Sequence, residues 1–180
     1  TATMLLEVGK LRILTDPVFD PAGGKYSFGW GTGSTKLTNA PFSTESLGRI
    51  DAVLLSHDHH EDNLDKAGRA FLPRVKRVLT TTSGGKRLRG NAEGLANWHS
   101  TVLESGDTKV KVTATPAQHG PLIVRPFAGQ TIGFMLEWEG QQHGALYITG
   151  DTIYYHGIDE VAERFTVSVG IFHLGRASFP

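Results

Sequence analysis

The stretch AVLLSHDHHEDNLD, residues 52–65, joins an apolar run to three histidines and a cluster of acids. The run 52–55 is typical of a short buried strand. Side chains along a strand alternate between its two faces, so we expect His57 and His59 to point to the same side. Two imidazoles on one rigid element suit a zinc ion, which binds neutral nitrogen at about 2.0–2.1 Å. The stretch therefore indicates a metal site, with a polar surface turn as the alternative.

Composition narrows the classes of protein that need to be considered. The chain has 180 residues, 39% of them apolar, which is enough for one globular domain with its own core. Lys plus Arg equals Asp plus Glu at 18 each, so no net charge favours nucleic acid or an anionic membrane as a partner. Cysteine is absent, which excludes disulfides, thiolate catalysis and cysteine-ligated metals. Any metal must be held by His, Asp or Glu.

The hydropathy and the ends of the chain bear on where in the cell we expect the protein. No apolar run reaches the roughly 18 residues of a membrane span, and no signal peptide opens the sequence. We expect a soluble, cytoplasmic protein, and a homo-oligomer is left open. Thr1 leads directly into a strand-like run and Pro180 closely follows another. We therefore expect a single domain over residues 1–180 that is clipped at both termini.

Most of the chain is predicted to form sheet. Gly9 and Lys10 separate two apolar runs, which predicts an antiparallel hairpin at the amino end. Runs rich in Val, Ile, Leu and Thr predict strands over 3–8, 11–15, 52–55, 77–81, 110–114, 133–138, 145–149 and 167–172. Helices are predicted over 65–72, 84–89 and 159–165. Residues 20–42 are predicted to form one long loop, with Trp30 among its exposed aromatic residues.

Two further groups that can bind a metal follow predicted strands. His119, in TPAQHGP, comes after the strand 110–114, and Asp151, in YITGDT, comes directly after the strand 145–149. Side chains from separate strand ends can converge where the backbone leaves the core. An ordinary loop histidine and a plain Gly-Asp turn are the alternatives for these two residues. Together with His57 and His59, they form a pattern typical of a metal site.

The motifs HDHHEDNLD, PAQHGP and ITGDT, in this order, resemble the metallo-β-lactamase superfamily over essentially the whole chain. The opening LLEVGKLRILTDPVF is similar to the branch that includes ascorbate-6-phosphate lactonases and N-acyl-phosphatidylethanolamine phospholipases. The resemblance implies an α/β fold, a four-layer αββα sandwich with the metal at one edge of its two sheets. It also implies that His57, His59 and His119 hold a first metal and that Asp151 bridges it to a second. The implied nucleophile is a bridging hydroxide.

The chain departs from the family pattern H-x-H-x-D-H after its second histidine. Without a gap, Glu61 takes the Asp position and Asp62 the His position. With one extra residue, Asp62 takes the Asp position and Asn63 replaces the His. We favour the second alignment because Asn63-Leu64-Asp65 then matches the H-L-D common in this branch. An amide is a poor zinc ligand, so a second metal is in doubt. His60 then either substitutes for the missing ligand or faces solvent.

Other residues are implied by their place near the site. His173 follows the last predicted strand and is a candidate ligand or substrate contact, although the family's last ligand usually lies further downstream. Asp16, at the end of the strand 11–15, is a candidate for a hydrogen bond that orients a ligand histidine. An Asp-Pro turn is the alternative for Asp16. Arg125 and Trp30 are candidate substrate contacts, and an arginine suits an anionic group.

The sequence thus predicts a metal-dependent hydrolase acting on a carbonyl or phosphoryl ester, such as a lactone or phosphodiester, through a metal-bound hydroxide. Asp62 and Asp151 are the predicted catalytic carboxylates and are both predicted metal ligands as well, with Asp62 orienting the nucleophile or accepting its proton. One or two zinc ions are expected, with manganese or iron as alternatives. A serine nucleophile is disfavoured because no G-x-S-x-G motif occurs. A non-catalytic or mononuclear metal-binding module of the same fold is the competing interpretation.

Overall fold

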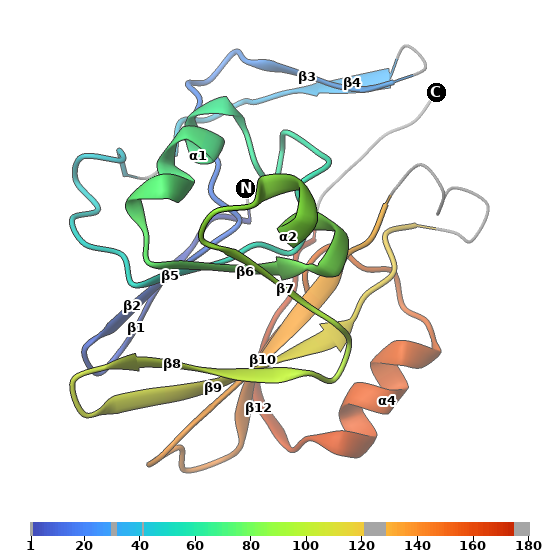
Figure 1. Cartoon of the computed structure of the whole chain (residues 1–180). Coiled ribbons are helices and arrows are strands. Elements are labelled where there is room, and N and C mark those ends of the chain that lie inside the picture. The colour runs from blue at the N-terminus through green and yellow to red at the C-terminus, as the bar shows by residue number, and fades with distance from the viewer. Residues whose placement is uncertain (1, 30–31, 41, 121–128, 175–180) are drawn as a thin grey trace.

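Two five-stranded sheets lie face to face, with helices on their outer faces (Figure 1). The computed structural model describes residues 2–29, 32–40, 42–120 and 129–174. The β3–β4 hairpin projects beyond the first sheet (Figure 1). The arrangement is a four-layer αββα sandwich, which confirms the fold class predicted from the sequence.

The first sheet has the strand order β1-β2-β5-β6-β7. Its strands are β1 (Leu5–Val8), β2 (Leu11–Thr15), β5 (Ala52–Leu54), β6 (Arg77–Thr81) and β7 (Ala92–Leu95). The pair β1–β2 is antiparallel, and its turn holds Gly9 at a φ of 55°. The remaining pairs are parallel. The predicted amino-terminal hairpin is therefore confirmed, and β5, which leads into the histidines, lies in the middle of the sheet.

The second sheet has the order β12-β11-β10-β9-β8. Its strands are β8 (Ser100–Ser105), β9 (Thr108–Pro116), β10 (Ile132–Trp138), β11 (Ala145–Ile148) and β12 (Val167–Ile171). Strands β8 to β11 pair antiparallel in succession, and β12 joins β11 in parallel. Since β9 and β11 are both antiparallel to β10, they run the same way and end at the same edge.

Alternation along the strands separates the layers of the core. In β2, Leu11 and Ile13 belong to the cluster between the two sheets, whereas Leu14 belongs to the cluster under α1. The first cluster also holds Phe134 of the second sheet, and the second holds Phe71 of α1. This division follows from the two-residue period of a strand, which sends successive side chains to opposite faces.

Short helices cover the outer faces of the sheets. They are α1 (Lys66–Phe71), the 3₁₀ helix η1 (Leu72–Arg74), α2 (Thr82–Leu88) and α4 (His156–Arg164). Helices α1 and α2 lie over the first sheet, and α4 lies beside the second (Figure 1). Val161 of α4 packs against Met135 and Tyr147, on the face of the second sheet that points away from the first.

The predicted elements differ from the structure in two places. Residues 20–42 do not form one unstructured loop, because they contain a hairpin of β3 (Lys25–Gly29) and β4 (Thr32–Thr35). Strands β7 and β8 were absent from the predictions. Strand β8 is at a sheet edge, and Leu103 is its only buried residue among those described, so its sequence lacks the apolar pattern of an inner strand. Each of the eight predicted ranges contains a strand.

None of the helices among the described residues combines the length and the hydropathy needed to cross a membrane.

Asp65 holds α1 in place and offers a first test of the fold. Its Oδ1 accepts a hydrogen bond from the Gly68 amide at 2.7 Å, and its Oδ2 lies 3.7 Å from the Lys36 ammonium. Both side chains of this ion pair are buried. We expect Asp65→Ala to lower the free energy of unfolding by about 3 kcal/mol, because it leaves a buried cation without its partner and a helix without its cap. Urea unfolding monitored by circular dichroism measures this change.

The exposed pair between Lys10 and Asp107, 3.8 Å apart, provides the matched control. Asp107→Ala should leave the unfolding midpoint where it is, because exposed ion pairs contribute little. Equal midpoints for Asp65→Ala and Asp107→Ala would contradict the role assigned to Asp65.

Candidate metal centre

Three strands deliver polar side chains to one edge of the sandwich. Strand β5 ends at Leu54, β9 at Pro116 and β11 at Ile148. The segment that follows β5 carries three histidines at positions 57, 59 and 60, here called the histidine segment (residues 56–63). His119 follows β9 and Asp151 follows β11. The structure thus brings together groups far apart in the chain, as the strand-end pattern predicts.

The closest group of imidazoles consists of His57, His60 and His119, here called the histidine cluster. One ring nitrogen from each lies within 4.8 Å of the others. Ring centroids are separated by 5.2 Å for His57 and His60, 5.4 Å for His57 and His119, and 4.8 Å for His60 and His119. His57 is fully buried and the other two are partly buried. Three nitrogen donors therefore converge on one small volume.

His59 is outside this cluster, which differs from the prediction. Strand alternation was expected to carry His57 and His59 to the same side, but β5 ends at Leu54 and the backbone bends before His57. The side chain of His59 is exposed, its ring centroid lies 6.2 Å from that of His57, and its Nε2 lies 2.9 Å from Nη2 of Arg87. His60, predicted as a substitute ligand or a solvent-facing residue, takes the third place.

His57 is oriented by polar neighbours on one side of its ring. Its Nδ1 lies 3.0 Å from Oγ of Ser56 and 3.4 Å from Nδ2 of Asn63. Asn63 also donates to Ser56 Oγ at 3.0 Å. Among the described residues, the buried Nε2 of His57 has no hydrogen-bond partner. When Nδ1 carries the proton and donates it to Ser56 Oγ, which Asn63 also holds, the lone pair of Nε2 is left for another ligand.

Burial sets the protonation of His57. It lowers the pKa of His57 to about 3, because a charged imidazolium is disfavoured away from water. The ring is thus neutral at physiological pH, with Nε2 able to donate a lone pair. A neutral imidazole is the form that binds a metal ion.

Asp151 lies beside the cluster and joins two histidines. Its Oδ2 is 3.5 Å from His119 Nε2, and its Oδ1 is 3.5 Å from His173 Nδ1. Burial would raise the pKa of Asp151, but hydrogen bonding to these two histidines outweighs it and holds the pKa well below its usual range. The same contact with Asp151 raises the pKa of His119. Asp151 is therefore a carboxylate anion at the edge of the cluster.

His173 and Asp16 lie behind Asp151. The His173 side chain is buried, and its Nδ1 is 3.7 Å from Asp16 Oδ2. Asp16 accepts a hydrogen bond from the Ser56 amide at 2.7 Å, and burial raises the pKa of Asp16 to about 7. Both residues are therefore placed at the site. Asp16 lies beside His173, which is itself a candidate ligand, and binds the backbone of the histidine segment.

Asp62 completes the polar surroundings of the cluster. It is partly buried, and its Oδ1 has no hydrogen-bond partner among the described residues. Burial, with the nearby Asp151 carboxylate, raises the pKa of Asp62. The predicted substrate contacts Arg125 and Trp30 lie outside the described residues.

The donor set fits a divalent cation. Ligand atoms at about 2.0–2.1 Å in a tetrahedral site are roughly 3.4 Å from one another. The three nitrogens lie within 4.8 Å of one another, so a bound ion would draw them closer together. The unpartnered, buried Nε2 of His57 supplies a lone pair that would otherwise be left without a hydrogen bond. Imidazole and carboxylate donors suit zinc, and also manganese or iron.

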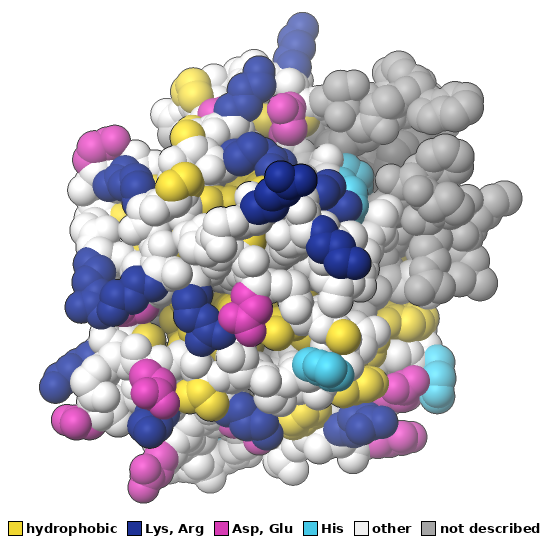
Figure 2. Space-filling view, in the orientation of Figure 1, with side chains coloured by type: hydrophobic (Ala, Val, Ile, Leu, Met, Phe, Trp, Pro, Cys, Tyr) yellow, Lys and Arg dark blue, Asp and Glu magenta, His cyan; other side chains and the backbone are white. Residues whose placement is uncertain are grey.

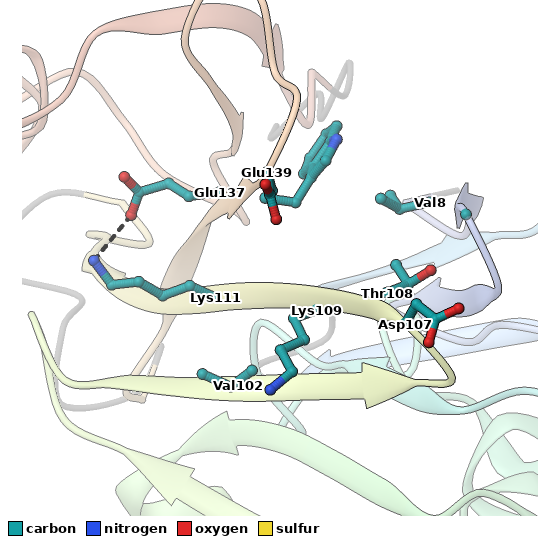
Figure 3. A pocket seen from close by; sticks show the side chains of 10 residues that line it. Val8, Val102, Asp107, Thr108, Lys109, Lys111, Glu137 and Glu139 are labelled. Carbon is teal, nitrogen blue, oxygen red and sulfur yellow. Dashed lines mark ion pairs between the residues drawn. The ribbon is translucent and has the colours of Figure 1, made fainter.

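A surface hollow lies at the other end of the sandwich and has different chemistry. It has a volume of about 830 Å³ and is lined by Thr108 and by the ion pair of Lys111 and Glu137 (Figure 3). Strand β9 begins at Thr108 and ends at Pro116, so the hollow is separated from His119 by the length of that strand. The groups that converge for metal binding are thus at the opposite edge.

Sequence reasoning missed the residues that hold the histidine segment from outside. Arg87, on α2, binds both Asp58 and His59. Asp58 lies inside the motif, but its sequence position carries no sign of a partner 29 residues away.

The chain is similar to known proteins both in sequence and in structure. A family model described as "Beta-lactamase superfamily domain" matches residues 11–173. A protein of Cupriavidus metallidurans named "UPF0173 metal-dependent hydrolase" is 24% identical over 164 residues, covering 81% of this chain and 55% of its own. An uncharacterized protein of Mycobacterium tuberculosis is 28% identical over 168 residues, covering 89% of this chain and 42% of its own. The chain thus spans about half the length of the curated relatives it matches.

Solved structures share the same architecture. The crystal structure of an isothiocyanate hydrolase from Delia radicum gut bacteria superposes with a TM-score of 0.74 at 22% identity, over 94% of this chain and 67% of that one. A possible metal-dependent hydrolase from Veillonella parvula gives a TM-score of 0.77 at 20% identity, with the same coverage. At these identities, the likeness is one of fold.

Proposed function

The chain belongs to the beta-lactamase superfamily, and from this premise we propose that it is a metal-dependent hydrolase whose histidine cluster holds the metal ion. The Cupriavidus metallidurans relative carries the name of a metal-dependent hydrolase, which supports the same reaction class. We assign His57, His60 and His119 as the metal-binding imidazoles and Asp151 as the adjacent carboxylate.

The observation that carries the proposal is the buried Nε2 of His57. It has no hydrogen-bond partner among the described residues, and burial keeps the ring neutral. A polar atom without a partner in a protein interior costs free energy. Two more imidazoles, from His60 and His119, bring their nitrogens to the same volume. A bound cation would use all three lone pairs and remove that cost.

The residues around the cluster have separate roles in the proposed hydrolysis. A divalent cation bound here supplies Lewis acidity, which polarises a carbonyl or phosphoryl oxygen and makes water a nucleophile at neutral pH. Ser56 Oγ accepts the Nδ1 proton of His57 and is itself held by a hydrogen bond from Asn63, which leaves Nε2 for the ion. The raised pKa of Asp62 makes its carboxylate a stronger base, so Oδ1 of Asp62 is the assigned proton acceptor. Asp151, as an anion beside His119, balances positive charge at the site.

We propose an ester of carbonyl or phosphoryl type, a lactone or a phosphodiester, as the substrate class. The isothiocyanate hydrolase of the same fold adds a third electrophile, a carbon double-bonded to nitrogen and sulfur. Zinc is the proposed metal because three imidazoles suit it, with manganese or iron as alternatives. Arg125 and Trp30 remain predicted substrate contacts.

Metal content paired with a substrate panel tests the proposal. Protein purified without chelator should contain about one ion per chain or more, measured by mass spectrometry. It should hydrolyse at least one of a chromogenic phosphodiester, a lactone, an isothiocyanate and a β-lactam. Chelation should abolish that activity and metal should restore it.

Two results separate the alternatives. Fewer than about 0.2 ions per chain, with none gained on adding Zn²⁺, would reject the metal site. Stoichiometric metal without turnover on any substrate would instead favour a non-catalytic metal-binding module, which the loss of a histidine at Asn63 also suggests.

A further inference from the structure

Arg87, near the end of α2, contacts two consecutive residues of the histidine segment. Its Nε donates to Oδ2 of Asp58 at 2.9 Å, and its Nη2 donates to Oδ1 of the same carboxylate. The same Nη2 lies 2.9 Å from Nε2 of His59. A guanidinium has donors and no acceptor, so Nε2 of His59 must be the acceptor of this bond.

The direction of that bond decides what His59 can offer a metal ion. A neutral imidazole has one nitrogen that carries a proton and one with a free lone pair. Arg87 uses the lone pair on Nε2, so the proton of a neutral His59 is on Nδ1. In this arrangement His59 has no free lone pair for a metal, although its ring centroid is only 6.2 Å from that of His57.

The backbone also confines the His59 ring. Gly129, at a φ of 71°, packs so closely against it that a Cβ there would lie 2.4 Å from Nε2 and Cε1 of His59. The next residue, Gln130, accepts hydrogen bonds from Thr82 Oγ1 at 2.9 Å and from Ser83 Oγ at 3.0 Å. Helix α2 therefore contacts the ring directly through Arg87, and through its bonds to Gln130 it holds the neighbouring Gly129 against the ring.

Asp58 anchors Arg87 in this position. The Asp58 side chain is 3% exposed, and Arg87 binds both of its carboxylate oxygens. Arg69 of α1 donates to the Asp58 carbonyl at 3.0 Å. Bidentate pairs of this kind restrict the guanidinium in orientation as well as in distance. Figure 2 shows Lys and Arg side chains gathered over α1 and α2, with a histidine beside them.

We propose that Arg87 selects which of two adjacent histidines binds the metal: its hydrogen bond withholds His59 and leaves His60 to complete the cluster with His57 and His119. Arg87 is thus a positioning residue, which acts through His59 and Asp58. The inference rests on the proposed function only in requiring that the cluster binds a metal ion.

Equilibrium binding of Co²⁺ tests the proposal without reference to activity. Affinity is measured by competition with a chromogenic chelator, and the visible absorption of bound Co²⁺ reports its coordination. His60→Ala should weaken binding by at least about 100-fold, because a direct ligand is lost. His59→Ala should change it by less than about 3-fold. His57→Ala serves as the reference for loss of a ligand.

The same substitutions in a variant that lacks Arg87 test whether Arg87 is what keeps His59 from binding the metal. The double variant Arg87→Met with Asp58→Asn removes both partners, so that no buried carboxylate is left unpaired. In this background the lone pair of His59 is available to the metal. His60→Ala should then lower the Co²⁺ affinity by about 10-fold or less, and the absorption of bound Co²⁺ should keep its intensity. Asp58→Asn alone separates the contribution of the carboxylate. Arg89→Met replaces an exposed arginine two residues further along the chain. In that variant, His60→Ala should lower the Co²⁺ affinity as much as it does in the otherwise unchanged protein.

Either of two results would overturn the selection by Arg87. One is an equal loss of affinity for His59→Ala and His60→Ala in the otherwise unchanged protein. The other is an unchanged cost of His60→Ala once Arg87 is replaced, with the fold retained by circular dichroism. If His57→Ala also binds Co²⁺ normally, then the metal site itself, and with it the proposed function, is wrong.

Discussion

Replacing His57 with alanine is expected to remove the metal ion from the cluster and to lower hydrolysis by at least about a hundredfold. Loss of residues that merely support a ligand already costs about 10–100-fold, and His57 is assigned as a ligand. Its ring is buried and neutral, with Nε2 aimed at no protein partner among the described residues. The measurement is metal content by mass spectrometry, together with kcat/KM on whichever substrate of the panel is cleaved.

An exposed histidine provides the control for this substitution. His99 lies outside the cluster, and its backbone forms hydrogen bonds with Ala96 and Ala114. His99→Ala should keep both the metal and the activity. Full metal content in His57→Ala, or activity that survives the substitution unchanged, would refute the assigned mechanism. A comparison of melting temperatures with and without Zn²⁺ adds a readout free of turnover, since a ligand that binds only the folded state raises stability.

Gly150→Ala is expected to have the largest effect on stability. Gly150 directly precedes Asp151 and has a φ of 61°. A Cβ at this position would lie 2.5 Å from the Ile132 carbonyl oxygen and 3.0 Å from Cβ of Ser56. Strain and overlap together should lower the free energy of unfolding by about 3 kcal/mol or more. Chemical unfolding measures this change, and metal affinity should fall with it because Asp151 and Ser56 are displaced.

Gly140 allows strain and overlap to be separated. Its φ is 88°, also in the left-handed region, but a Cβ there would meet nothing within 4 Å. Gly140→Ala should therefore cost about 1 kcal/mol and leave metal affinity as it is. If the two alanine variants unfold at the same denaturant concentration, then close packing of Gly150 against Ile132 is not what this position requires.

Much of the architecture is predictable from local patterns. The two-residue period of β2 sends Leu11 and Ile13 to one layer of the core and Leu14 to another. Apolar runs bounded by turn residues locate the inner strands, because such strands are buried on both faces. Strands at the edges of the sheets cannot be located in this way. Among the residues whose burial is described, Leu103 alone is buried in β8, and Gly33, Ser34 and Thr35 of β4 are exposed, so these sequences resemble those of loops.

The site is predictable in its location but not in its membership. His119 and Asp151 are found beside the histidine segment because strand ends of one direction meet at one edge of the sheets. The choice between His59 and His60 could not be predicted. Alternation applies only while the backbone stays extended, and β5 ends at Leu54, before either histidine.

The sequence by itself determined the inner strands, the strand ends that carry metal-binding groups and the absence of cysteine ligands, because these depend on local periodicity and on composition. The four layers were implied by the resemblance to a known family. Only the tertiary structure decided which way each imidazole faces. That choice depends on contacts between residues distant in the chain, such as the bond from Arg87 to His59 and the packing of Gly129 against the same ring. Hydrogen bonds of this kind form only when the helices pack on the sheet, so they cannot be predicted from a sequence motif.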